Sequence, residues 1–274
     1  MSVALLGEDF SGGTFRRMFR ADNPAGLATA IAVALGLIVL NQLLQLGFAL
    51  LAQRLLFGHE AGDTRQIVKA GLVGLLPASL LTAICAVLLA RLRGGSPLAV
   101  LNLRWPRLGA LGWPLLVSGF IVGLYAAVML LVSVLGIDLA QYTPGPHGES
   151  PQTGSAGLVK EAMFDIANDP RLFLLVLPSV GIGAPLAEEL IFRGQIFTAL
   201  SRTRLGFSGT TLITSAAWAL MHYSEPWLSI AMIFLMGLAF GYFLYRFGSL
   251  WVTMICHSVW NLTYSLLILV AIAQ

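Results

Sequence analysis

Charged residues are scarce in this sequence of 274 amino acids: they make up 11% of it, whereas 57% of the residues are hydrophobic. An ordinary soluble domain carries about 25% charged residues, so the composition excludes that class. Long apolar runs are typical of helices that cross a bilayer, because a helix satisfies its own backbone hydrogen bonds in lipid. We therefore expect an all-α fold, a polytopic membrane helical bundle.

Cysteine is also rare. The two cysteines, Cys85 and Cys256, both fall inside apolar runs. This excludes a disulfide framework and a zinc site built of thiolates, and we expect both side chains to pack in the core. The formal net charge of +3 requires no nucleic-acid partner, since the basic residues lie in loops at the membrane surface.

Seven apolar runs are candidates for crossing a hydrocarbon core of about 30 Å, which takes about 20 helical residues. These runs are residues 25–53, 67–90, 108–136, 172–200, 208–223, 227–245 and 249–272. Of the 16 Lys and Arg residues, 10 lie in inner segments and 5 in outer ones if the N-terminus is inside. The runs predict about seven transmembrane helices, and the positive-inside rule predicts N-in/C-out topology. We expect a multi-pass protein of the bacterial plasma (inner) membrane.

We divide the chain into four parts. They are a cytoplasmic N-terminal segment (1–24), three accessory transmembrane helices (25–136), an external loop (137–171) and a four-helix membrane core (172–272). In the first part, apolar residues stand beside arginines, which predicts a short helix lying on the inner surface; these residues are Phe10, Phe15, Met18 and Phe19.

Two further patterns predict helix contacts. Residues 158–168 of the external loop have the apolar spacing of an amphipathic helix that rests on the outer surface, whereas residues 141–157, with His147, are rich in Pro, Gly and Ser. The small-residue pairs Gly119-xxx-Gly123 and Gly237-xxx-Gly241 predict that two pairs of helices approach closely.

The chain is organised around the stretch Pro185-Leu-Ala-Glu188-Glu189-Leu-Ile-Phe-Arg193, which lies inside the fourth apolar run. Each charge there costs roughly 2.5–3.5 kcal/mol on insertion scales. Glu189 and Arg193 are spaced i,i+4 and can pair on one helix face. Glu188 points about 100° away from them, toward a neighbouring helix, where a desolvated carboxylate makes a general base. The alternative is that both acids pair with Arg193 and only hold helices together.

Two histidines lie in later apolar runs. His222 follows Trp218 by one helical turn, and His257 shares a helix face with Asn261. With a rise of about 1.5 Å per residue, these side chains and Glu188 can meet at one depth of the bilayer. A kink at Pro185 could open a polar cavity beside Glu188.

These motifs resemble those of the CAAX-protease and bacteriocin-processing (CPBP/Abi) family of intramembrane endopeptidases. Over about residues 178–265 the chain has a Glu-Glu-xxx-Arg motif, an aromatic-xxx-His motif and a His-xxx-Asn motif in the family's order. The resemblance implies that Glu188 and His222 activate water and that His257 and Asn261 stabilise the oxyanion. Glu189, Arg193 and Trp218 would support them. Trp218 departs from the family pattern, which more often has phenylalanine there.

Three alternatives stay open at the level of sequence. Glu188, His222 and His257 form the ligand set of many zinc hydrolases, although the His-Glu-x-x-His spacing is absent; we favour a protease without metal. A non-catalytic scaffold or immunity protein would use the same polar cluster to bind a partner helix. A proton-coupled transporter is disfavoured because no internal repeat is visible. The expected partners are the lipid bilayer and a peptide or membrane-protein substrate: a prenylated C-terminal peptide, a leader peptide or a membrane-anchored regulator.

Overall fold

The computed structural model describes residues 3–11, 17–20, 26–58, 63–139 and 155–272. Its longer elements in these ranges are helices, which confirms the all-α prediction, and no strand occurs among the described residues. The helices that build the bundle are α3 (Leu27–Ala52), α4 (Thr64–Leu92), α6 (Gly112–Leu135), α8 to α10 (Pro170–Leu200), α11 (Gly206–Leu220), α12 (Trp227–Phe247) and α13 (Leu250–Ile272). Each predicted span is thus represented by a helix.

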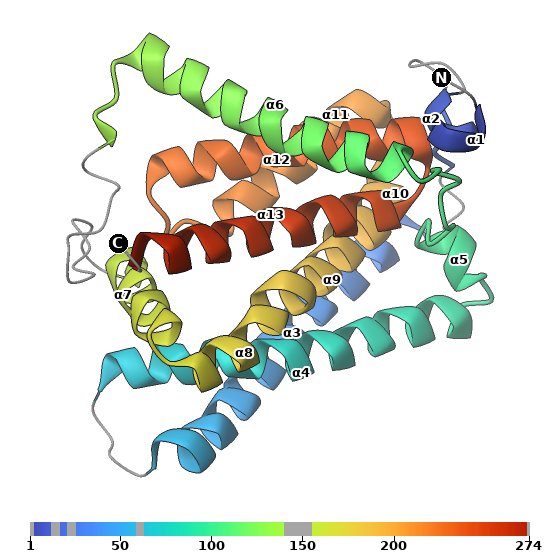
Figure 1. Ribbon diagram of the computed structural model, residues 1–274. Coiled ribbons are helices and arrows are strands. Elements are labelled where there is room, and N and C mark those ends of the chain that lie inside the picture. The colour runs from blue at the N-terminus through green and yellow to red at the C-terminus, as the bar shows by residue number, and fades with distance from the viewer. Residues whose placement is uncertain (1–2, 12–16, 21–25, 59–62, 140–154, 273–274) are drawn as a thin grey trace.

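The described residues contain five helices that are long and apolar enough to cross a membrane. They are Leu27–Phe57, Thr64–Leu92, Gly112–Leu135, Pro170–Leu200 and Trp227–Phe247. The fifth predicted span, α11, has only 15 residues. Helices α1 (Val3–Leu6) and α2 (Glu8–Ser11) lie at one end of the bundle, and the last turn of α13 lies at the other end (Figure 1). The count of seven crossings and the N-in/C-out orientation stay predictions.

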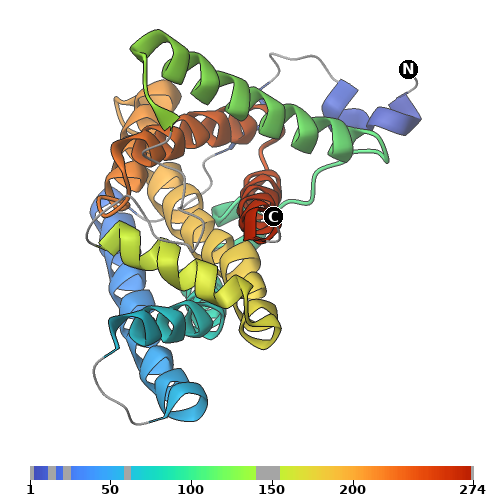
Figure 2. The same ribbon diagram turned by 60° about the vertical axis from the view of Figure 1, so that its left-hand side comes forward.

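The run from Pro170 to Leu200 is the most buried of the five and changes helical register twice. Between α8 (Pro170–Pro178), α9 (Ala184–Glu189) and α10 (Phe197–Leu200) lie two π-helical segments, η3 (Ser179–Gly183) and η4 (Leu190–Ile196). Such wide turns often mark functional sites. The run packs against α4 on one side and α13 on the other (Figures 1 and 2), so side chains of α9 face several neighbouring helices.

The two small-residue motifs have different outcomes. A Cβ atom at Gly237 of α12 would lie 2.7 Å from Ser215 Cβ of α11, and one at Gly241 would collide with Thr211. The predicted close approach is therefore confirmed for this motif. The prediction for Gly119 and Gly123 of α6 is wrong, because no described atom lies within 4 Å of a Cβ built at either position.

A helix forms over most of residues 158–168, as predicted, and its placement on the outer surface stays a prediction. Helix α7 (Ser155–Ala167) buries Ala162 and Ile166 against the bundle. Two ion pairs join it to α4: Arg65–Glu161 at 2.8 Å and Lys69–Asp165 at 3.0 Å. Residues 141–154, with His147, lie outside the described residues.

The N-terminal segment differs from the predicted surface helix. Residues 17–20 are not helical, and the Met18 amide donates to the Tyr245 carbonyl at 2.9 Å. Phe19 is buried, with ring-centroid distances of 5.5 Å to Phe197 and 5.3 Å to Phe207. A backbone contact and an aromatic pocket therefore fix this segment at the end of α12. Phe15 lies outside the described residues.

Candidate active site

Glu188 lies on the wall of a polar cavity inside the bundle. The cavity has a volume of about 260 Å³ and is formed by α3, α4, the α9–η4 run and the end of α11. Its polar lining residues are Asn41, Gln42, Gln45, Glu188, Trp218 and His222. Glu188 and His222, which are 34 positions apart in the sequence numbering, thus line the same cavity, as the sequence predicts.

Trp218 holds the Glu188 carboxylate. Its indole Nε1 donates a hydrogen bond to Glu188 Oε2 at 2.7 Å. Trp218 is only 2% exposed, so the ring is fixed by packing and the bond to the charged carboxylate is shielded from water. The partner of Glu188 comes from α11 and not from its own helix. A phenylalanine at position 218 could not make this bond, because it has no donor.

The same residue also orients His222. This histidine lies in the turn just after α11, and its Nδ1 is 2.9 Å from the Trp218 carbonyl oxygen. A carbonyl oxygen only accepts hydrogen bonds, so Nδ1 carries the proton and donates it. In the neutral imidazole, Nε2 then carries the lone pair and can accept a proton.

Glu189, Arg193 and His257 form a separate, buried cluster. Arg193 Nη1 lies 3.0 Å from Glu189 Oε1, and the same oxygen lies 3.3 Å from His257 Nδ1. The side chains of Glu189 and Arg193 are 0% and 1% exposed. The Arg193 guanidinium also stacks 4.2 Å from the centroid of Trp218. The predicted i,i+4 pair therefore forms, and it supports the ring that holds Glu188.

Asn261 makes a backbone contact. Its Nδ2 donates to the Val180 carbonyl oxygen at 2.8 Å. In the π register of η3, Ala184 N–H bonds to Ser179 O, and the next bond would run from residue 185 to Val180. Pro185 has no N–H, so the Val180 carbonyl accepts the Asn261 amide instead. The structure thus gives a local reason for Asn261 and for the break that Pro185 was predicted to cause.

The four predicted catalytic residues are divided among three places. Glu188 and His222 line the cavity, whereas His257 faces Glu189 and Asn261 faces Val180. The cavity that Glu188 and His222 line also has three amide side chains of α3 in its wall: Asn41, Gln42 and Gln45. The sequence-based reasoning missed them, although Asn and Gln inside an apolar run indicate a functional site. Asn41 Oδ1 lies 3.1 Å from Thr82 Oγ1, and the same hydroxyl donates to the Ala78 carbonyl oxygen at 2.9 Å.

Glu225 lies close to His222, in the loop between α11 and α12. Burial raises the pKa of its carboxyl above the usual range, and Lys160 of α7 and His222 act in the opposite direction. Burial likewise lowers the pKa of Lys160, against the attraction of Glu225. The half-buried Lys160–Glu225 pair therefore connects α7 with the end of the site.

The described residues contain no group of three or more His, Cys, Asp or Glu side chains that could hold a metal ion. The zinc ligand set considered from the sequence, Glu188, His222 and His257, does not converge, because His257 is directed at Glu189. The residues as placed do not fit a three-ligand zinc site.

Residues 170–263 match the family model described as "Type II CAAX prenyl endopeptidase Rce1-like". The match confirms the resemblance predicted from the motifs and includes every predicted site residue. The matched range does not include α3, α4 or α6, and so it does not include the α3 amides. No curated protein and no solved structure matched the chain. The matched family and the apolar helices indicate an integral membrane protein with a protease-type core.

Proposed function

We propose that this protein is an intramembrane endopeptidase in which Glu188 and His222 activate water. The observation that carries the proposal is that Trp218 orients both residues on the wall of one cavity, Glu188 through its indole N–H and His222 through its carbonyl oxygen. A base held by fixed hydrogen bonds in a small polar cavity meets the geometric requirement of general base catalysis.

The chemistry follows from the free atoms of the two residues. Glu188 Oε2 is engaged by Trp218, so Glu188 Oε1 accepts a proton from water while the oxygen attacks the carbonyl carbon of the scissile bond. His222 Nε2 accepts a hydrogen bond from the same water and orients it. When the tetrahedral intermediate collapses, the C–N bond breaks and the proton on Glu188 passes to the leaving amine.

The oxyanion needs donors on the opposite side of the cavity. We propose that Asn41 and Gln45 of α3 provide them, since both amides line the space that Glu188 faces. Neutral amide donors are suitable groups for an oxyanion hole. In this proposal His257 and Asn261, which the family resemblance assigns to the oxyanion, act as positioning residues: His257 through Glu189, and Asn261 through η3.

The substrate class follows from the matched family's description. We propose a prenylated C-terminal peptide as the first substrate to test, with leader peptides and membrane-anchored regulators next. The purified protein in vesicles should release the C-terminal fragment of a prenylated peptide, detected by mass spectrometry. Cleavage should persist after treatment with a zinc chelator. Chelator-sensitive cleavage that zinc restores would support the metalloprotease, and a folded protein that cleaves none of the three substrate classes would support the scaffold.

A further inference from the structure

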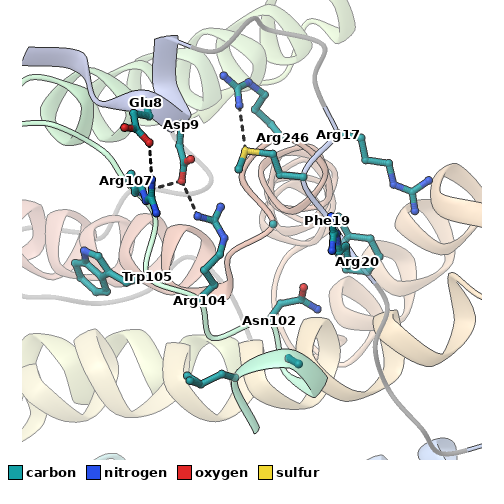
Figure 3. A pocket seen from close by; sticks show the side chains of 14 residues that line it. Glu8, Asp9, Arg17, Phe19, Arg20, Asn102, Arg104, Trp105, Arg107 and Arg246 are labelled. Carbon is teal, nitrogen blue, oxygen red and sulfur yellow. Dashed lines mark hydrogen bonds and ion pairs between the residues drawn. The ribbon is translucent and has the colours of Figure 1, made fainter. Parts of the chain in front are cut away.

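A second cavity lies at the end of the bundle where the N-terminal segment docks (Figure 3). Its volume is about 750 Å³, and it shares no lining residue with the Glu188 cavity. The N-terminal segment, the loop between α5 (Pro97–Val100) and α6, and the junction of α12 and α13 form its walls. Its charged lining residues are Glu8, Asp9, Arg17, Arg20, Arg104, Arg107 and Arg246.

The carboxylates of this cavity are already paired. Glu8 forms an ion pair with Arg107 at 2.6 Å, and Asp9 forms one with Arg104 at 2.9 Å. Among the described residues, Arg20 has no recorded hydrogen bond or ion pair, and Arg17 contacts only aromatic rings. The arginines therefore exceed the carboxylates, and the cavity has a positive potential that attracts an anion.

Asn102 adds a second, independent observation. This residue is 6% exposed, and its Nδ2 has no hydrogen-bond acceptor within the described part of the chain. Its side chain belongs to the lining of the cavity (Figure 3). A buried donor without an acceptor is costly and rare in native structures. Asn102 therefore brings a buried donor without an acceptor to the lining of a positively charged cavity.

The rim of the cavity is apolar. Leu98 is 63% exposed and Trp105 is 58% exposed, and both belong to the cavity lining. Trp105 packs against Trp113 and Trp251, at centroid distances of 5.8 and 5.5 Å. Tryptophans of this kind gather where a membrane protein meets the headgroup region. The site therefore combines an anion-binding interior with a rim suited to hydrocarbon.

We propose that this cavity binds the phosphate headgroup of an anionic membrane phospholipid, with its acyl chains along Leu98 and Trp105. The phosphate oxygens would accept hydrogen bonds from Arg20 and, once the Asn102 amide turns toward the cavity, from its Nδ2. Basic pockets at the ends of transmembrane helices bind such headgroups by the same chemistry. The site is independent of the proposed proteolysis, because it lies apart from Glu188.

The experiment is native mass spectrometry of the full chain in detergent, titrated with phosphatidylglycerol or with phosphatidylcholine of the same chains. Arg20→Gln removes a charge, and Asn102→Asp replaces the donor with a carboxylate while suiting the backbone, which has φ +50° at this position. Both variants should bind phosphatidylglycerol at least about tenfold more weakly than the parent, because hydrogen bonds to charged groups are the strong ones. Arg91→Gln, an exposed arginine outside the cavity, is the matched control and should bind as the parent does.

Equal binding of the two lipids by the parent, or an equal loss in Arg91→Gln, would overturn the proposal. Glycerol phosphate distinguishes the source of the anion: micromolar binding of this soluble compound to lipid-free protein would overturn the lipid assignment and indicate a soluble phosphate ester. Thermal unfolding without lipid shows whether each variant is folded. Glu188→Gln should bind phosphatidylglycerol normally, so the result is independent of the proposed protease chemistry.

Discussion

Trp218 Nε1 donates to Glu188 Oε2 at 2.7 Å, and the carbonyl oxygen of the same tryptophan accepts from His222 Nδ1 at 2.9 Å. One buried residue of α11 therefore sets the position of both groups that we assign to water activation. It is in turn held by Arg193, whose guanidinium lies 4.2 Å from its ring centroid.

Trp218→Phe tests this positioning role. The variant keeps a buried aromatic ring and the backbone carbonyl, and loses only the N–H that bonds to Glu188. We expect kcat to fall about tenfold or more, the scale of a lost hydrogen bond to a charged group, while KM and the folded yield change little. Measurements of kcat and KM on an identified peptide give the result. An unchanged kcat would show that the hydrogen bond does not position the base.

The Glu189–Arg193 pair should act on stability. Replacing either residue with Ala leaves the other charge buried, which costs about 3–5 kcal/mol, so the yield of folded protein should fall. The double change of Glu189→Gln with Arg193→Met should recover part of that yield, as measured by size-exclusion chromatography in detergent. If Glu189→Ala instead abolishes activity at an unchanged folded level, Glu189 takes part in the chemistry.

Glu225 should make stability depend on pH. Its folded pKa is raised by burial, so the folded state binds a proton more tightly than the unfolded state. Stability is then highest below the unfolded pKa and falls as pH rises through the raised folded value. Glu225→Gln removes this dependence. The difference in Tm between variant and parent should therefore be more positive at pH 8 than at pH 4, and a constant difference would contradict the burial of this carboxyl.

The orientation can be tested by labelling. With single cysteines in a background without Cys85 and Cys256, a membrane-impermeant maleimide should label intact cells at position 155 and not at position 96. This follows from the arginine bias, which places Ser96 inside and Ser155 outside. The reverse pattern would overturn the N-in orientation.

Sequence spacing predicted the contacts that lie along one helix or depend on small residues. The Glu189–Arg193 pair follows from i,i+4 geometry, and the α11–α12 approach follows from Gly237 and Gly241. Both contacts depend on the spacing of residues along one helix, which can be read directly from the sequence. The helical turn also explains why the side chains of Glu188 and Glu189 point in different directions. Glu188 bonds to Trp218, and Glu189 pairs with Arg193.

The sequence could not predict which neighbour each polar side chain faces. Distance along a helix gives the depth of His257 and Asn261 but not the rotation of α13 about its axis, which turns His257 to Glu189. The π register of η3, which gives Asn261 its backbone partner, depends on packing against α4 and α13. The α3 amides were missed for a different reason: Asn41 and Gln45 carry no charge and lie outside the three motifs of the resembled family.

The central claim is that Glu188 is the base that activates water, and Glu188→Gln tests it most directly. Glutamine keeps the shape of the side chain and can accept the Trp218 hydrogen bond, but it cannot take a proton from water. At matched folded yield, cleavage of an identified peptide in vesicles should slow by about 10²–10⁴-fold, the contribution of general base catalysis. Cleavage by Glu188→Gln at a near-normal rate would contradict the assignment.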